Sequence, residues 1–169
     1  MTQILRPNSN VTKANFYNGY AAIDETPYSD SDQAYHTDES TGTSLATLEV
    51  GLTDPAGTPA PGTCTVRYRM AKINTYGGAL VSTGSNPTAQ MHVYQGATLI
   101  ASDAVKTLTT GAFADYAFTP DLSAVTDWSD LRLRLVSNAL NYRGAGISFA
   151  ELEVPDDIPD SSDMMLAFG

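Results

Sequence analysis

The chain has 169 residues, a formal net charge of −10 and a pI near 4.3. This length, with 42% hydrophobic residues, suits one domain with a core of its own. The acidic balance argues against a nucleic-acid partner, because neutralising phosphates requires a concentrated basic surface. The N-terminus lacks the layout of a signal peptide, and no apolar run approaches the roughly 18 residues of a membrane span. We therefore expect no membrane partner and no export.

The first 32 residues predict an extended N-terminal arm followed by an acidic loop. The run Thr2-Gln-Ile-Leu-Arg-Pro7 is extended and ends at proline, which favours an edge strand or an arm. Residues 8–32 are rich in Asn, Ser, Asp and Gly, which predicts a loop with a short strand inside it. The acidic residues of this region could hold a calcium ion through their oxygens, although a solvated acidic loop without metal is the preferred interpretation: Asp24, Glu25, Asp30 and Asp32.

The middle of the chain predicts a series of short strands separated by turns. The Pro- and Gly-rich residues 54–62 join two strands, and Gln95-Gly-Ala97 predicts a hairpin turn. A turn of helix is expected within residues 120–128. The predicted strands cover residues 33–36, 43–52, 63–73, 88–95, 98–101, 105–108, 112–119, 131–136 and 147–154.

Three of these strands alternate apolar and charged residues. Leucines alternate with two arginines in residues 131–135, and Glu151 and Glu153 share a strand face with Phe149. If the strands pair, opposite charges would form ladders across an outer sheet face. An acidic partner could also meet these arginines. The charged sheet face that we predict comprises Arg67, Arg69, Arg132, Arg134, Glu151 and Glu153.

The strand spacing and the near absence of helical periodicity predict an all-β fold. We expect a single antiparallel β-sandwich or jelly-roll domain over residues 1–155, with the N-terminal arm at its start. Residues 156–169 form an extended acidic tail that ends in Met164-Met-Leu-Ala-Phe168. This tail is either a frayed end or a last strand of its own domain, or it packs against a neighbouring subunit. The expected partner contacts are Ile4, Leu5, Arg6, Met164, Met165, Leu166 and Phe168.

No pattern in the chain indicates catalysis. His36 and His92 stand at no metal-ligand spacing, so each is interpreted as a strand histidine with satisfied hydrogen bonds. Cys64 is interpreted as a small packed residue. The chain has no G-x-S-x-G elbow, and we expect no catalytic, cofactor-binding or metal-binding residue.

Aromatic residues offer an alternative function. Exposed rings at loop tips could stack against sugars, although ordinary core or loop packing of these scattered aromatics is the preferred interpretation. The candidates are Tyr17, Tyr20, Tyr28, Tyr35, Tyr76, Tyr94 and Trp128.

An ordered set of short motifs resembles small virion proteins of tailed bacteriophages. The motifs span most of residues 1–155 and are Ile4-Leu-Arg-Pro7, Tyr20-Ala-Ala-Ile-Asp-Glu25, Val66-Arg-Tyr-Arg69, Asp130-Leu-Arg-Leu-Arg-Leu135 and Phe149-Ala-Glu-Leu-Glu-Val-Pro155.

The resemblance implies a non-enzymatic capsid decoration, or cement, protein on the outside of the head. Its partners would be the major capsid protein and neighbouring copies of itself, and it would be made in the host cytoplasm and located on the virion surface. The alternative is a carbohydrate- or receptor-binding β-sandwich module of a phage tail or fibre, with a glycan as partner. A glycosidase or depolymerase domain is a remote third interpretation, because it requires paired acids in a cleft.

Overall fold

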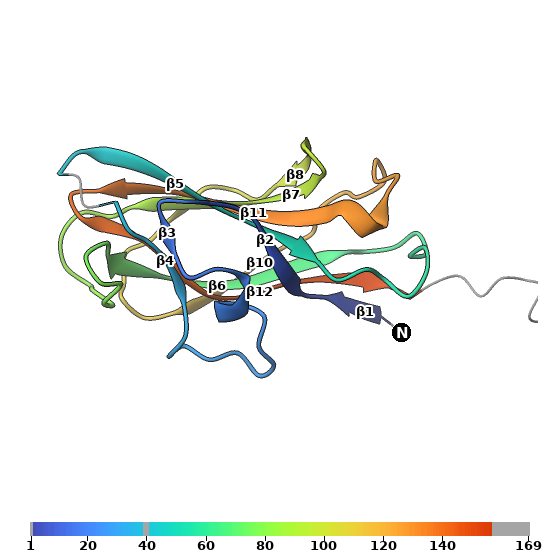
Figure 1. Ribbon diagram of the computed structural model, residues 1–169, viewed down its shortest axis with the longest axis horizontal. Coiled ribbons are helices and arrows are strands. Elements are labelled where there is room, and N and C mark those ends of the chain that lie inside the picture. Colours follow the sequence, from blue (N-terminus) through green and yellow to red (C-terminus); the bar gives the residue numbers. More distant parts are fainter. Residues whose placement is uncertain (1, 39–40, 157–169) are drawn as a thin grey trace, which may run out of the picture.

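The computed structural model describes residues 2–38 and 41–156. Strands dominate these residues, and the only helical elements among them are two short 3-10 turns (Figure 1). The elements are β1 (Thr2–Leu5), β2 (Pro7–Ala14), β3 (Phe16–Tyr17), η1 (Tyr20–Ala22), β4 (Ala34–His36), β5 (Thr43–Leu52), β6 (Thr65–Asn74), β7 (Thr88–Gln95), β8 (Thr98–Ser102), β9 (Lys106–Thr107), β10 (Ala114–Phe118), η2 (Trp128–Asp130), β11 (Leu131–Leu140) and β12 (Arg143–Pro155).

The strands form two antiparallel layers. In the first sheet, β6 lies between β10 and β12, and the other edge of β12 pairs with β1 and β4. In the second sheet the order is β2, β5, β11, β7, and β7 also pairs with β8 and β9. The β11–β12 hairpin joins the layers, with Leu140 paired to Arg143. The predicted all-β antiparallel sandwich is confirmed.

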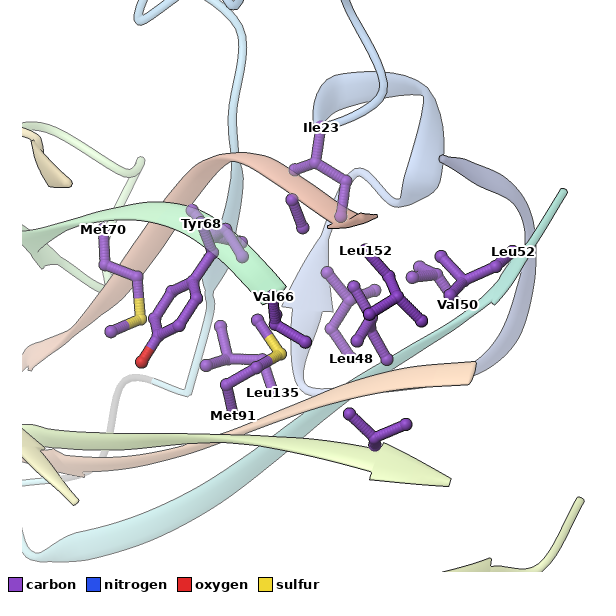
Figure 2. Packing of buried hydrophobic residues seen from close by; sticks show 14 of the residues in the cluster. Ile23, Leu48, Val50, Leu52, Val66, Tyr68, Met70, Met91, Leu135 and Leu152 are labelled. Atoms are coloured by element: carbon purple, nitrogen blue, oxygen red, sulfur yellow. The ribbon is translucent and has the colours of Figure 1, made fainter. Parts of the chain in front are cut away.

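The core lies between the two sheets (Figure 2). Alternation sends every second side chain inward, so Leu131, Leu133 and Leu135 of β11 face the core while the two arginines between them do not. Burying each large apolar side chain contributes about 1.5–3 kcal/mol. The largest contributors include Leu48, Val66, Tyr68, Met70, Met91 and Leu152.

The N-terminal residues match the sequence prediction in part, because the predicted edge strand is present but a second strand follows it. Thr2–Leu5 is strand β1, paired with β12, and Leu5 is only 2% exposed in the core. Leu5 is therefore a core residue of this domain and not a contact for a neighbouring subunit, whereas Ile4 remains on the surface. The chain crosses at Arg6 into strand β2, which the sequence predicted as a loop. Strand β2 is polar because it is an edge strand with one partner, β5.

Other predicted elements match the structure closely. Strand β5 has the predicted bounds Thr43–Leu52, and the hairpin of β7 and β8 turns at Gly96, where φ is +55°. The turn of helix lies slightly later than predicted, at η2, where the Asp127 side chain accepts a hydrogen bond from the Ser129 backbone N–H.

Two further predictions concern the C-terminal contacts and a membrane span. The predicted contacts Met164, Met165, Leu166 and Phe168 lie outside the described residues. Across residues 2–38 and 41–156, no helix has the length and hydropathy needed to cross a membrane.

Candidate functional site

The outer face of the first sheet carries a ladder of opposite charges. Arg67 on β6 lies opposite Glu151 on β12, and the Arg67 guanidinium contacts both Glu151, at 3.5 Å, and Glu153. Arg6 approaches the second oxygen of Glu151 at 3.1 Å. The Glu151 side chain is thereby held between two arginines and is 11% exposed.

Arg69 fixes the acidic loop to this face. Its Nε and Nη2 atoms donate to the two carboxylate oxygens of Asp30 at 3.1 and 2.8 Å, and Nη1 donates to Asp115 at 2.5 Å. The hydroxyl of Ser148 also donates to Asp30 at 2.9 Å. Hydrogen bonding from Arg69 lowers the pKa of Asp30. The Asp30 carboxylate is therefore bound by arginine, and in the described part of the chain no three His, Cys, Asp or Glu side chains gather in a metal-binding group.

The anchored loop places an aromatic ring over the sheet. The Arg69 guanidinium carbon lies 4.1 Å from the centre of the Tyr28 ring, which sits 5.7 Å from the Phe149 ring. Tyr28 remains 45% exposed. A bidentate ion pair and a cation–π contact thus hold Tyr28 in place while leaving one side of it open.

These side chains border a pocket of about 360 Å³, which we call the Tyr28 pocket. Phe149, Arg67, Ala117 and Glu151 lie on the outer face, whereas the Tyr68 and Tyr116 side chains stack on each other toward the core. The pocket is lined by Tyr28, Arg67, Tyr68, Asp115, Tyr116, Ala117, Phe149 and Glu151. It combines aromatic surface with a guanidinium and two carboxylates, which suits a small polar ligand with one flat apolar face.

The second sheet carries a separate set of charges on its outer face. Glu49 of β5 accepts from Arg132 at 3.2 Å and from Arg134 at 2.6 Å, and its side chain is 2% exposed. Arg132 also donates to Asp130, and Arg134 stacks 3.7 Å from the Tyr94 ring centre. The structure therefore divides the six predicted charged residues between the outer faces of two sheets. Arg132 and Arg134 pair with β5 and β7, and β11 meets β12 only at Leu140 and Arg143, away from Glu151 and Glu153.

The predicted aromatic candidates are scattered. Tyr28 is the one candidate that lines the Tyr28 pocket, whereas Tyr17 packs on Tyr35 and Tyr94 stacks on Arg134. Sequence reasoning missed Phe149 as an aromatic candidate. The sequence pattern that could have identified Phe149 is its place on the same strand face as Glu151 and Glu153.

The histidines and the cysteine have structural roles. His36 is fully buried between Ser137 and Ser44, with ring nitrogens 3.1 and 3.2 Å from their hydroxyls, and burial lowers its pKa to about 4. His92 lies 2.8 Å from the Ser102 hydroxyl, and burial and Arg134 lower its pKa. Burial raises the pKa of the Cys64 thiol. The prediction of hydrogen-bonded strand histidines is confirmed.

Comparisons with known proteins relate the chain to others by fold. No family model matches it, and no curated protein does. The K3 cleaved adhesin domain of Lys-gingipain from Porphyromonas gingivalis superposes with a TM-score of 0.52 at 7% identity, over 90% of this chain and 99% of that one. TmCBM61, solved with β-1,4-galactotriose, gives 0.49 at 9% identity, over 89% and 86% of the two chains.

A family 35 carbohydrate-binding module from Clostridium thermocellum gives a TM-score of 0.47 at 9% identity, over 93% of this chain and 99% of that one. At these identities the likeness to the adhesin domain shows a shared fold alone. The chain is thus a β-sandwich whose function must be argued from its own residues.

Proposed function

We propose that this protein is a non-enzymatic glycan-binding module whose binding site is the Tyr28 pocket. One observation carries the proposal: the exposed, anchored ring of Tyr28 stands beside Phe149, with Arg67, Asp115 and Glu151 around the same pocket. The proposal rests on this pocket and not on the comparisons.

The chemistry of a sugar matches both halves of the pocket. A pyranose ring presents C–H groups that pack on an aromatic face, and its hydroxyls need donors and acceptors at fixed positions. Arg67 supplies a donor fork that is 44% exposed, and Asp115 supplies a carboxylate that is 76% exposed. The volume of about 360 Å³ falls at the lower end of the roughly 300–1,000 Å³ typical of ligand pockets.

Charge favours a neutral sugar. The net charge of −10 would repel an acidic polysaccharide approaching the surface. Within the pocket, Arg67 is matched by Glu151, and Asp115 is bound to Arg69. Both carboxylates are held by arginines, which suits binding better than the acid and base pair of a glycosidase.

The capsid decoration role implied by the sequence resemblance stays a prediction. Leu5, one of its expected contacts, is buried in the core, and the expected contacts at the C-terminus lie outside the described residues. The virion location and the capsid partner stay predictions with it. A cement protein would bind purified capsids and ignore glycans, so a glycan array separates the two functions.

The test is a glycan array with the full chain, followed by calorimetry on the best neutral glycan. Tyr28→Ala should weaken that affinity about fivefold, because aromatic stacking contributes on the order of 1 kcal/mol. Tyr28→Phe should keep most of the affinity, since the ring remains. The control is Tyr76→Ala, which removes a ring that is 71% exposed and does not line the pocket.

Two outcomes would overturn the proposal. One is an array in which no glycan binds. The other is a glycan whose affinity is unchanged by Tyr28→Ala, in particular if Trp128→Ala abolishes binding instead.

A further inference from the structure

A second pocket, of about 370 Å³, lies at the end of the first sheet where β6 begins and β10 ends. Two loops build it: the linker between β5 and β6, and the segment between β10 and η2. We call it the Trp128 pocket. It is separate from the Tyr28 pocket, and the two share no lining residue.

The Trp128 pocket is lined mainly by apolar side chains. Pro59, Leu122, Val125 and Trp128 contribute to its wall, and Asp121 is the one charged side chain among the described residues that line it. The Asp121 carboxylate already accepts a hydrogen bond from the backbone N–H of Ser123. The indole and aliphatic side chains in this wall favour an occupant with apolar side chains, because covering them removes apolar surface from water.

The end of the described chain lies beside this pocket. The backbone N–H of Ala60, a lining residue, donates to the carbonyl of Asp156 at 3.0 Å. Pro155 packs on Gly62, another lining residue, so closely that a Cβ on Gly62 would lie 2.8 Å from the Pro155 ring. In Figure 1 the end of β12 and the β5–β6 linker meet at the same end of the molecule.

The sequence beyond this point supplies an apolar segment of suitable size. Residues 157–163 are followed by Met164-Met-Leu-Ala-Phe168. Seven extended residues span up to about 24 Å, which is enough to return to a pocket beside their starting point. A short tether also gives the segment an effective concentration of order millimolar at its own domain, above that of any second copy in dilute solution.

We propose that residues 164–168 dock in the Trp128 pocket of the same chain, with their apolar side chains against Trp128. Docking would cover the apolar side chains of the pocket wall. The sequence predicted these residues as a contact for a neighbouring subunit, and the position of Asp156 beside the pocket favours their own domain instead. This inference does not depend on the glycan proposal.

The chain carries its own probes for a test, because its one tryptophan and its one cysteine both line the pocket. The experiment measures acrylamide quenching of Trp128 fluorescence in the full chain and in the double variant Leu166→Asp/Phe168→Asp. The variant should raise the quenching constant about twofold and shift the emission to the red, since a tethered segment that docks shields most of the population. Alkylation of Cys64 by a neutral maleimide should also become faster.

The matched control is Leu80→Asp/Val105→Asp, which adds the same two charges at exposed apolar positions that do not line the pocket. It should leave quenching unchanged. Equal quenching in the parent chain and in Leu166→Asp/Phe168→Asp would overturn the proposal, as would an equal increase in the control. Shielding that grows with protein concentration, together with a doubled mass in light scattering, would instead assign the docked segment to a second copy and overturn docking within the chain.

Discussion

The outer faces of the two sheets are built from similar residues but differ in what covers them. On the second sheet, Glu49 is 2% exposed between Arg132 and Arg134, and Arg134 is capped by Tyr94. On the first sheet, Arg67 is 44% exposed, and the pocket beside it is open to solvent. Both faces pair their charges, but the first sheet leaves the side chains of Arg67 and Asp115 more exposed, beside the pocket.

The difference comes from the loop that crosses the first sheet. Asp30 and Ser148 anchor it, and Tyr28 stands above the strands as a second wall. Without a loop that holds an aromatic ring above it, a row of paired charges on a sheet forms a flat surface with no pocket. Alternating charges in a strand therefore indicate an outer face, and a loop held above that face makes it a candidate site.

Acid should cause the largest loss of stability among these tests. The ring of His36, on β4 of the first sheet, is hydrogen-bonded to Ser137 and Ser44 of the second sheet. Its pKa in the folded protein is about 4, below the usual 6.5, so the unfolded chain binds a proton that the native state excludes between these values. Stability from this group is full above about pH 6.5 and is lost as pH falls toward 4, by about 3 kcal/mol in total. Urea unfolding from pH 8 to pH 4 measures this loss.

Replacing the histidine provides the control for that profile. His36→Gln should flatten the loss between pH 6.5 and 4, whereas His92→Gln should leave most of it. A wild-type profile that stays flat over this range would contradict the assignment.

Glu49→Gln tests the closed face and should have the next largest effect. Removing the charge leaves Arg132 and Arg134 without their shared acceptor, and we expect a loss of about 2 kcal/mol of unfolding free energy. The loss stays below the 3–5 kcal/mol known for fully buried pairs, since both arginines can regain water. The matched variant on the open face, Glu153→Gln, should cost about 0.5 kcal/mol. Equal losses would show that the two faces do not differ in this way.

Asp30→Asn tests the anchor of the loop and should have a smaller effect on stability than Glu49→Gln. Asp30 is 41% exposed, so the loss in urea unfolding should be no more than about 1 kcal/mol. Under the proposed function, glycan affinity should still fall severalfold, because Arg69 would hold Tyr28 less firmly. Asp115→Asn, at a carboxylate that is 76% exposed, should change stability less. Unaltered affinity in Asp30→Asn would separate the anchor from binding.

The sequence predicted the sheet faces better than it predicted the site. Alternation placed the leucines and the arginines of residues 131–135 on opposite sides of a strand, and the structure agrees, because side-chain direction in a strand is a local property. Strand β2 was missed because its polar residues match a loop, and its pairing with β5 depends on distant residues.

The partners of the charged residues depend on strand order, which local patterns do not contain. The pairing of Arg134 with Glu49 joins residues 85 positions apart. The contact of Tyr28 with Phe149 likewise requires a loop to fold over a strand near the other end of the chain. Composition identified both residue types, but only the fold brings them together.

The hairpin at Asn141 and Tyr142 has a consequence for the order in which the protein folds. It joins β11, a central strand of the second sheet, to β12, a central strand of the first, across a short turn. Local hairpins close in microseconds, whereas the pairing of distant strands is slow. We expect this hairpin to act as the kinetic nucleus, with each of its arms serving as the template on which one sheet assembles.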